Sequence, residues 1–193
     1  MELDKIIEKR KSARSFKSKK VPLNKVVLAL DAGLQAPFAG NIGHLYFLVT
    51  EDSEKINKIA SYCQQTWMTE SNIVVLVCSN DIQLETAYGE RGRIYSRQQA
   101  GAAIENILLK LTEQGLSSCW VGSYSDELVK QTMQIPEHIQ IEAILPIGYE
   151  NKVPGSDKKK KPELYNCLFW EIWDSMKRPT IFKEAPRDKD PWS

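Results

Sequence analysis

The chain has 193 residues, 42% of them hydrophobic and 26% charged, which is typical of one globular domain and excludes a disordered chain. Lys and Arg number 26 against 25 Asp and Glu, so the net charge of +1 gives no global attraction to nucleic acid or to membranes. No signal peptide or membrane-length apolar run is visible, and with only 2 histidines we expect no metal site. We therefore expect a cytoplasmic protein with neither nucleic-acid nor membrane partners.

Hydrophobic periodicity predicts helices alternating with strands. Helices are expected over 3–10, around 23–30, over 56–63, 96–114, from 126 to before 136, and over 168–176. Strands are expected over 45–50, 73–78, 118–121 and 139–147. The second strand should be covered on both faces and the last one half-buried, while Gly115 should cap the longest helix. Three of the 4 cysteines lie in apolar stretches, which predicts buried free thiols. This order predicts a layered α/β or α+β fold.

Donor side chains alternate directly after the first expected helix, at Arg10, Ser12 and Arg14. In extended chain, alternate side chains point to one side. Guanidinium forks and a hydroxyl that converge there would suit a phosphate. Taken alone, the segment fits a solvated basic turn better, and the rest of the sequence is what favours the phosphate.

Three later segments also carry candidate chemistry. Small residues with Pro and Gly over 36–41 let a backbone lie against a flat ligand, and the Asn41 amide suits a heterocycle edge, although an ordinary loop fits equally well. Gly122 permits backbone exposure at the end of a strand. The lysines at 158–161 are too few, and lack the interleaved aromatics, for a nucleic-acid patch.

Taken in order, these segments resemble the nitroreductase family of FMN-dependent oxidoreductases. The resemblance covers residues 3–176 and rests on Arg-x-Ser-x-Arg-x-Phe at 10–16, Ala-Pro and Gly-Asn within 36–41, Ala-Ala-x-x-Asn at 102–106, and the strand end at Gly148-Tyr149. It implies an α+β sandwich with a central mixed β-sheet flanked by helices. It also implies a homodimer with one FMN at each subunit interface, a domain over 1–176, and a C-terminal tail over 177–193 that wraps the partner.

The resemblance further implies which residues bind the cofactor. The phosphate and ribityl chain would contact Arg10, Lys11, Ser12 and Arg14, with a second basic pair at Lys158 and Lys160. The partner subunit would cover the flavin ring with Pro37, Phe38, Ala39 and Asn41. The pyrimidine edge would meet Gln64, and the flavin N5 would face the backbone N–H groups of Val121 and Gly122. Lys11 or Arg14 would stabilise the reduced flavin near N1.

Substrate is expected to lie at a rim formed by Phe38, His44 and the segment 88–95. Phe38 stands where the family often has serine, and Gly43-His44 where it commonly has Gln-Pro. The resemblance therefore implies no particular substrate. The segment 88–95 is interpreted as a mobile loop, with Tyr88 for stacking on an acceptor and two arginines for nucleotide phosphates. An ordinary exposed loop explains it equally well. The two arginines are Arg91 and Arg93.

The expected activity is hydride transfer from NAD(P)H, through flavin N5, to a small acceptor such as a nitroaromatic, a quinone or an enone. Because the cofactor carries the chemistry, no catalytic side chain is required. Three alternatives remain open: a flavin- or nucleotide-binding protein without turnover, a flavin dehalogenase of the same fold, and a basic-loop interaction module without a cofactor.

Overall fold

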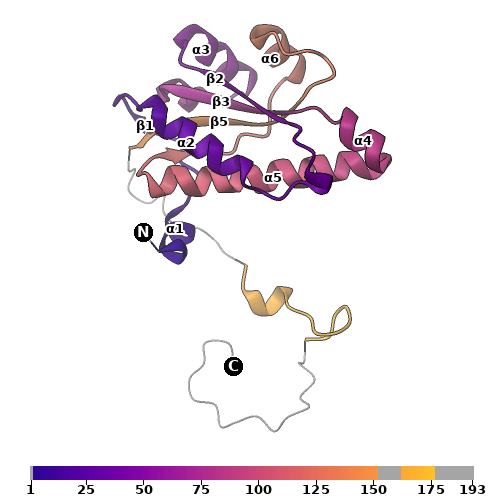
Figure 1. The fold of residues 1–193 in the computed structure, drawn as a ribbon. Helices are drawn as coiled ribbons and strands as arrows, with labels where there is room; N and C mark the ends of the chain where they lie inside the picture. The colour runs from indigo at the N-terminus through magenta and orange to yellow at the C-terminus, as the bar shows by residue number, and fades with distance from the viewer. Residues whose placement is uncertain (1, 152–161, 177–193) are drawn as a thin grey trace, which may run out of the picture. The chain divides into compact units, whose positions relative to one another are not determined.

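A computed structural model describes residues 2–151 and 162–176 of the chain. Contacts divide the chain into two compact units, Met1–Ser156 and Asp157–Ser193. The first unit carries the β-sheet and the helices that cover it (Figure 1). The division falls at 156, whereas the sequence predicted one domain over 1–176. The tail over 177–193 lies outside the described residues, so its role stays a prediction.

The first unit is built around an antiparallel sheet with the strand order β1-β5-β3-β2, in which β4 also pairs with β5. The strands are β1 Phe16–Lys17, β2 Leu45–Thr50, β3 Ile73–Ser79, β4 Ser117–Ser118 and β5 Gln140–Glu150. Every ladder of the described residues is antiparallel, and parallel pairing is confined to one bridge between Ser12 and Ser118. Within the described residues, that bridge is therefore the parallel part of the expected mixed sheet.

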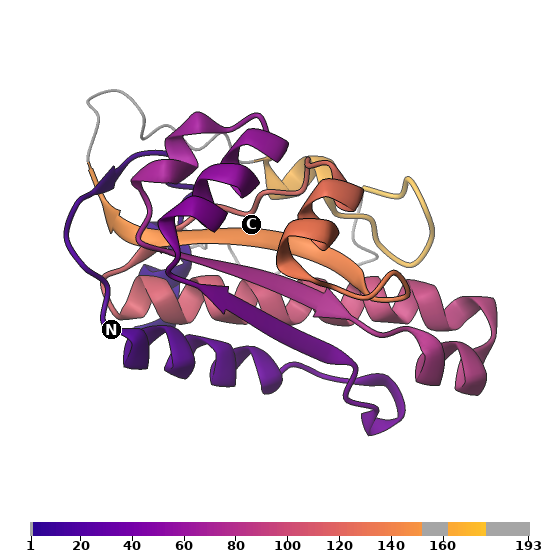
Figure 2. The ribbon, with the colours of Figure 1, turned by 90° about the horizontal axis from the view of Figure 1, so that it is seen from above.

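Helices cover both faces of the sheet (Figures 1 and 2). They are α1 Leu3–Lys9, α2 Leu23–Leu34, α3 Ser53–Tyr62, α4 Ile82–Tyr88, α5 Glu90–Glu113 and α6 Asp126–Met133, with the short turns η1 Ala39–Asn41 and η2 Thr66–Glu70. Along β3, Val75 and Val77 pack with the α2 and α5 side chains, and Val74 and Leu76 with those of α3 and α6. The predicted two-sided burial of this strand is confirmed. No helix in the described ranges is long and apolar enough to cross a membrane.

β5 is buried on both faces over most of its length, although its alternating apolar residues predicted one solvent face. Residues 143–148 are all buried. Ile144 joins the core under α3 and α6, while Leu145 joins the core under α2 and α5. The half-buried prediction is therefore wrong, because β5 lies inside the sheet between β1 and β3 with helices on both sides.

The segment 88–95, predicted as a mobile loop, is helical. α4 ends at Tyr88 and α5 begins at Glu90, separated only by Gly89, whose φ of 59° and ψ of −141° are rarely adopted by L-residues. A Cβ on Gly92 would lie 2.3 Å from the Leu84 carbonyl oxygen, so α4 and α5 approach at this residue. The loop prediction is wrong because one glycine turns the chain and the other allows two helices to touch.

The end of α5 follows the predicted glycine cap. Gly115 has a φ of 75°, and its N–H donates to the Thr112 carbonyl at 3.1 Å. The Leu116 N–H donates to the Leu111 carbonyl at 2.9 Å, which completes the two-bond glycine motif. At the start of α6, Ser125 occupies the predicted N-cap position without a side-chain capping bond.

In the second unit, residues 168–176 do not form the predicted helix. Only a short 3-10 turn, Leu164–Cys167, precedes them within 162–176. Glu171 and Asp174 have φ values of 65° and 66°, in the left-handed region that interrupts a helix. Trp173 is 86% exposed, so the apolar spacing of this segment finds no core within its own unit.

Thiol reactivity provides a direct check of the core. Cys63, Cys78 and Cys119 are buried free thiols, as predicted, whereas Cys167 is exposed. Burial raises the pKa of Cys63 and of Cys78 to about 11, which leaves little thiolate near neutral pH. A chromogenic aryl disulfide should therefore modify 1 thiol per chain rapidly in the native protein and all 4 after denaturation. A Cys167→Ser variant should lose the fast phase, and a second fast thiol would contradict this burial.

Candidate functional site

The segment between α1 and β1 holds its donors in extended chain. The Ala13 N–H donates to the Ser118 carbonyl at 3.0 Å, and the parallel bridge joins Ser12 to the same strand. Ala13 is buried, whereas Ser12 and Arg14 are exposed, so both donors point away from the core side. The predicted alternation is confirmed for these two residues.

Two other cations of this segment lie against carboxylates of the same chain. Arg10 Nε lies 3.0 Å from Glu105 Oε1 on α5, and Lys11 Nζ lies 3.0 Å from Glu150 Oε1 at the end of β5. Arg14 forms no salt bridge to any residue that the structure describes. An anion bound here would therefore meet Arg14 without competition and would compete with carboxylates for the other two cations.

A buried hydroxyl without a partner lies beside these donors. Ser118 Oγ makes no hydrogen bond within the described residues. Burial raises the pKa of the neighbouring Cys119 thiol, while Arg14 and Ser12 act in the opposite direction. An unsatisfied buried hydroxyl costs ~1–3 kcal/mol, which a ligand oxygen at this point would relieve. The sequence prediction included neither Ser118 nor Cys119, because nothing in their spacing shows that β4 runs beside residues 12 and 13.

The strand end after β4 differs in part from the prediction. The Val121 N–H donates to the Ile144 carbonyl at 3.0 Å and so is already used within the sheet, and the predicted contact of this residue with a ligand stays a prediction. Gly122 is exposed, and no atom lies within 4 Å of where its Cβ would stand. The Ser125 N–H donates to the Tyr62 carbonyl at 3.1 Å, which places the end of α3, where the exposed Gln64 follows, near this segment. Gln64 and Gly122 thus each lie within three residues of this hydrogen bond.

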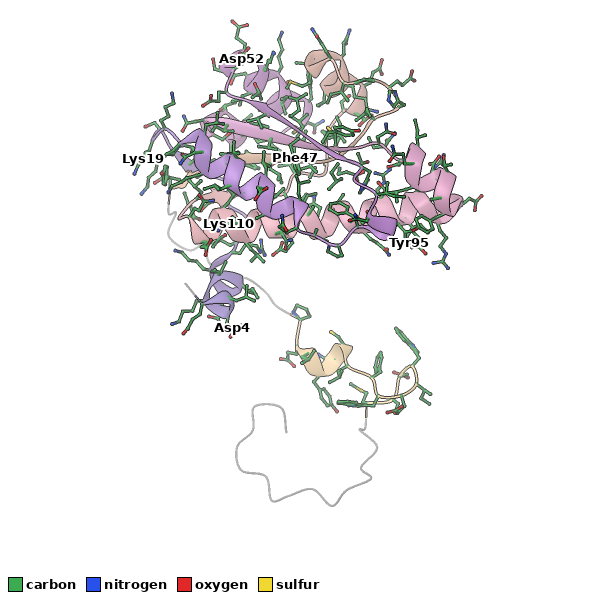
Figure 3. All side chains as sticks on the ribbon, in the orientation of Figure 1. Asp4, Lys19, Phe47, Asp52, Tyr95 and Lys110 are labelled. Atoms are coloured by element: carbon green, nitrogen blue, oxygen red, sulfur yellow. The ribbon has the colours of Figure 1, made fainter. Side chains whose placement is uncertain are left out.

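The loop after α2 lines a cavity of about 340 Å³. The lining residues come from this loop and from α5: Pro37, Phe38, Ala39, Tyr95, Gln98, Gln99 and Ala102. Figure 3 shows Tyr95 beside η1. Asn41 ends η1 with a φ of 56°, and its N–H donates to the Phe38 carbonyl at 3.0 Å. Three of the four residues predicted to cover a flavin ring therefore share one cavity, and the fourth adjoins it in sequence.

Tyr88 borders the same loop, from the end of α4. Its ring packs edge-on against Tyr95, with centroids 5.3 Å apart. Its hydroxyl lies 2.6 Å from the position that a Gly40 Cβ would occupy, so this glycine leaves room for the tyrosine. Arg91 and Arg93, predicted at the rim, are exposed on the first turn of α5 and are absent from the lining of the cavity.

Arg93 also has a partner, since its guanidinium pairs with Glu85 on α4.

The predicted second basic pair, Lys158 and Lys160, lies outside the described residues. Within residues 2–151 and 162–176, no group of three or more His, Cys, Asp or Glu side chains could hold a metal ion.

His44, predicted at the substrate rim, is buried with 2% exposure. Its Nε2 lies 3.4 Å from the Ser96 carbonyl oxygen, and its Nδ1 has no partner among the described residues. The ring meets Phe38 edge-on, with centroids 5.8 Å apart. The rim position is therefore wrong, because Phe38 lines the cavity and His44 supports Phe38 from the protein side.

A polar network that the sequence did not indicate lies next to His44. Arg97 on α5 pairs with Asp81 and with Glu142, and its Nη1 donates to Ser79 Oγ at 2.9 Å. Ser96 Oγ donates to Asp81 Oδ1 at 2.6 Å. The network joins the end of β3 to α5 and to β5, and removing one partner would leave a part-buried charge uncompensated.

The folded protein should lose stability as the pH falls below 6.5, the ordinary pKa of histidine. Burial lowers the pKa of His44, outweighing the Ser96 hydrogen bond and the nearby Asp81, which raise it. The unfolded chain therefore binds the proton more readily, so the free energy of unfolding decreases as the pH falls through this window. Urea unfolding at several pH values measures the slope. A His44→Gln variant should flatten it and the exposed His138→Gln should not; equal slopes in all three proteins would contradict the prediction.

The two groups of predicted contact residues lie at opposite ends of α2, as both ribbon views show (Figures 1 and 2). The segment 10–15 lies near the start of α2, and η1 follows its end. α2 has 12 residues. A helix of that length spans ~18 Å. The two groups of one chain are therefore not parts of one compact pocket.

The "Nitroreductase family" model matches this chain over residues 7–81 and 61–149. The chain belongs to the nitroreductase family. The match spans η1, the whole sheet core and the segment that leads into β5, so it includes the cavity and the strand end at Gly122.

Solved and curated relatives agree with this membership. A Methanothermobacter thermautotrophicus protein provisionally named an NADH dehydrogenase/NAD(P)H nitroreductase is 26% identical over 174 residues, covering 88% of each chain. A nitroreductase family protein of Clostridium difficile 630 has the same fold, with a TM-score of 0.76 at 24% identity over 89% of this chain and 99% of that one. An iodotyrosine deiodinase solved with FMN and 3-iodo-L-tyrosine gives 0.69 at 26% identity, over 84% and 95%.

The residues at the segment 10–15 fit the phosphate end of FMN. A phosphate monoester is close to doubly charged and offers several acceptor oxygens. Arg14 supplies a guanidinium with no carboxylate partner among the described residues, and Ser118 supplies a hydroxyl that lacks a hydrogen bond there. The donor set therefore suits the group that the deiodinase relative contains.

Proposed function

We propose that this protein is an FMN-dependent oxidoreductase that transfers hydride from NAD(P)H, by way of FMN, to a small acceptor such as a nitroaromatic, a quinone or an enone. Membership of the nitroreductase family and the FMN in a solved relative support this. The observation that carries the proposal is the cluster of Ser12, Arg14 and the unsatisfied Ser118 hydroxyl. Such a cluster is expected where a protein binds an anion.

The chain's own residues would bind and orient the cofactor. When bound, FMN supplies the hydride chemistry. Ser12 and Arg14 would hold its phosphate and ribityl chain, and the exposed backbone of Gly122 would approach its ring. Phe38 and Ala39 would cover a ring face and exclude water.

We also propose a homodimer in which each FMN meets both copies. Each FMN would then contact the segment 10–15 of one chain and the loop after α2 of the other chain, since these two segments lie at opposite ends of α2. Leu23, Val27 and Leu34 share one side of α2 and are 46%, 54% and 47% exposed, which makes an apolar surface for a second copy. Two equivalent contacts related by a two-fold axis are the commonest arrangement for such a surface.

The visible spectrum of the gently purified protein tests the function. A flavin spectrum that bleaches anaerobically with NAD(P)H and recovers with a quinone or a nitroaromatic is expected. A coloured protein that NAD(P)H does not reduce would favour flavin binding without turnover. A colourless protein that takes up no added FMN would refute the proposal.

Reductive deiodination is the second candidate, because a solved iodotyrosine deiodinase shares the fold. The discriminating assay supplies 3-iodo-L-tyrosine to the protein with dithionite as reductant and measures released iodide. Iodide release with slow nitroaromatic turnover would favour the deiodinase. The reverse pattern would favour the oxidoreductase.

A further inference from the structure

Glu70, the last residue of η2, is hydrogen-bonded to the end of the segment 10–15 and to the start of β1. Its Oε2 atom accepts a bond from Ser15 Oγ at 3.1 Å and a bond from the Phe16 N–H at 2.8 Å. Because the acceptor is a carboxylate, both bonds are charge-assisted and stronger than bonds between neutral groups. The contact joins parts of the chain that are 54 and 55 residues apart, so no local pattern in the sequence predicts it.

Aromatic packing places η2 against β1 beside this carboxylate. The rings of Phe16 and Trp67 lie with their centroids 6.3 Å apart, and Phe16 is buried. On the β5 side, a Cβ on Gly148 would lie 2.6 Å from the Phe16 ring, so this glycine makes room for the ring. The Phe16 side chain is therefore packed between β5 and η2, which keeps its N–H within reach of Glu70.

The Glu70 carboxylate lies at the edge of β1 that β5 leaves unpaired. β1 has 2 residues and stands at one end of the strand order. On its paired edge, the Asn151 N–H donates to the Ser15 carbonyl at 3.0 Å. Successive residues of a strand direct their backbone groups to opposite edges, so the Phe16 N–H points away from β5. Glu70 is the acceptor that it meets there.

The backbone on both sides of Arg14 is thereby fixed. Before it, the Ala13 N–H donates to the Ser118 carbonyl at 3.0 Å. After it, Ser15 is bonded to β5 through its carbonyl and to Glu70 through its hydroxyl. A donor that is held in place before binding loses less conformational freedom when a ligand arrives. Without Glu70, the residues that follow Arg14 would be held from one edge of the strand alone.

Electrostatic attraction does not explain a carboxylate at this place. Glu70 contacts the residue next to Arg14, and a negative charge there repels an anion that the arginine would bind. Its contribution to anion binding must therefore come from geometry. Glu70 is also exposed and belongs to neither core cluster, so a substitution there leaves the packing of the core unchanged.

We propose that Glu70 is a positioning residue for anion binding, which holds the segment 10–15 in the conformation that presents Ser12 and Arg14 to a phosphate group. It acts through these two donors. The shared chemistry of the ligand is a phosphate, either free or carried as the monoester of FMN. Naming FMN rests on the proposed function, whereas the positioning of the segment does not.

Three substitutions of Glu70 separate its reach from its charge. Glu70→Gln retains the length and an oxygen acceptor, Glu70→Asp retains the charge on a shorter side chain, and Glu70→Ala retains neither. Fluorescence titration of the flavin-free protein should give Glu70→Ala and Glu70→Asp a dissociation constant for FMN that is ~10-fold higher, and Glu70→Gln one within ~3-fold of the original. Tighter binding by Glu70→Gln and Glu70→Ala would show that only the charge matters, and would overturn the proposal.

Two comparisons make this result specific to positioning. Riboflavin, which lacks the phosphate, should bind Glu70→Ala and the original protein alike. In a protein that already carries Arg14→Ala, adding Glu70→Ala should raise the dissociation constant for FMN by only ~2-fold, because coupled residues are not additive. A full ~10-fold effect in that background would mean that Glu70 does not act through Arg14, and would overturn the proposal.

Thr69 provides the matched control on η2. Its hydroxyl donates to the Thr66 carbonyl at 2.9 Å, within the same turn, and its side chain is exposed. Thr69→Ala changes the residue next to Glu70 without removing a bond to β1, so it should leave the affinity for FMN unchanged. An effect as large as that of Glu70→Ala would attribute the loss to the turn as a whole, against the proposal.

Amide hydrogen exchange of the flavin-free protein tests the positioning without any ligand. The Ala13 N–H bonds to β4 and not to Glu70, yet it should exchange ~10-fold faster in Glu70→Ala if the segment is released. The β3 amides should exchange at the original rate. Unchanged exchange at Ala13 would overturn the proposal, and equally faster exchange of the β3 amides would show general destabilisation instead.

Titration with inorganic phosphate, followed by phosphorus NMR, separates this inference from the proposed function. If the protein binds phosphate but not FMN, the proposed function fails, and a weaker phosphate affinity of Glu70→Ala still supports the positioning role. If NAD(P)H reduces a bound flavin and the affinity for FMN is the same in all three Glu70 variants, only the inference fails. If neither FMN nor phosphate binds, both fail.

Discussion

Replacing Arg14 with alanine is expected to raise the dissociation constant for FMN by ~10- to ~100-fold, since a charge-assisted hydrogen bond contributes ~1.5–3 kcal/mol. Arg14 is the cation of its segment for which the described residues provide no carboxylate, so its interaction energy is available to a phosphate. Fluorescence titration of the flavin-free protein with FMN measures the change. Riboflavin, which lacks the phosphate, should bind the variant and the original protein alike.

Two further variants make this result specific. Arg14→Lys retains the charge but not the paired N–H geometry, so it should recover only part of the affinity. Lys58→Ala removes a positive charge from an exposed position on α3 and should leave the FMN affinity unchanged. Weakening of riboflavin binding as strong as that of FMN in Arg14→Ala would mean that the arginine does not read the phosphate.

Replacing Gly92 with alanine is expected to destabilise the folded protein by about 3 kcal/mol, because overpacking against rigid backbone is costly. The new Cβ would lie 2.3 Å from Leu84 O, 2.4 Å from Leu84 C and 2.5 Å from Glu85 N, and all three are main-chain atoms that cannot rotate away. α4 and α5 would have to separate. Thermal unfolding should show a melting temperature lower by ~6–12 °C for a chain of this size.

Gly101 provides the matched control on the same helix. A Cβ there would meet only the end of the Trp120 ring, at 3.9 Å, which is an ordinary contact. Gly101→Ala should therefore stabilise the protein by up to ~1 kcal/mol, because alanine favours helix more than glycine does. The two substitutions are expected to have opposite signs. If both destabilise the protein equally, the close approach at Gly92 is not the cause.

Local chemistry was sufficient to predict several elements. The β-branched run at 73–78 and the glycine at 115 determine a strand and a helix end through interactions within a few residues, and both are confirmed. The segments 88–95 and 168–176 were predicted wrongly for a tertiary reason. In the first, α4 packs against α5, and the glycine-containing segment becomes helical. In the second, the apolar side chains find no core within the described part of their own unit.

The residues of the candidate site also separate into those that a local pattern predicts and those that depend on the tertiary structure. Ser12 and Arg14 could be predicted because alternation in extended chain is a local property. The burial of His44 could not, since it depends on Phe38 closing over it and on α5 lying behind. Ser118 was missed for a related reason. A single polar residue in an apolar pattern gives no sign of whether its hydrogen-bond partner is present in the fold.

The pairing of β1 with β5 determines when the segment 10–15 can acquire its structure during synthesis. Phe16 pairs with Glu150, and the Asn151 N–H donates to the Ser15 carbonyl at 3.0 Å. A ribosome must therefore deliver nearly the whole first unit before residues 10–15 acquire their geometry. A nascent chain that ends before β5 has the donors in its sequence but no surface that holds them together. Under the proposed function, a chain is therefore expected to acquire its cofactor only after β5 has been synthesised, and a product truncated before β5 is expected to bind no flavin.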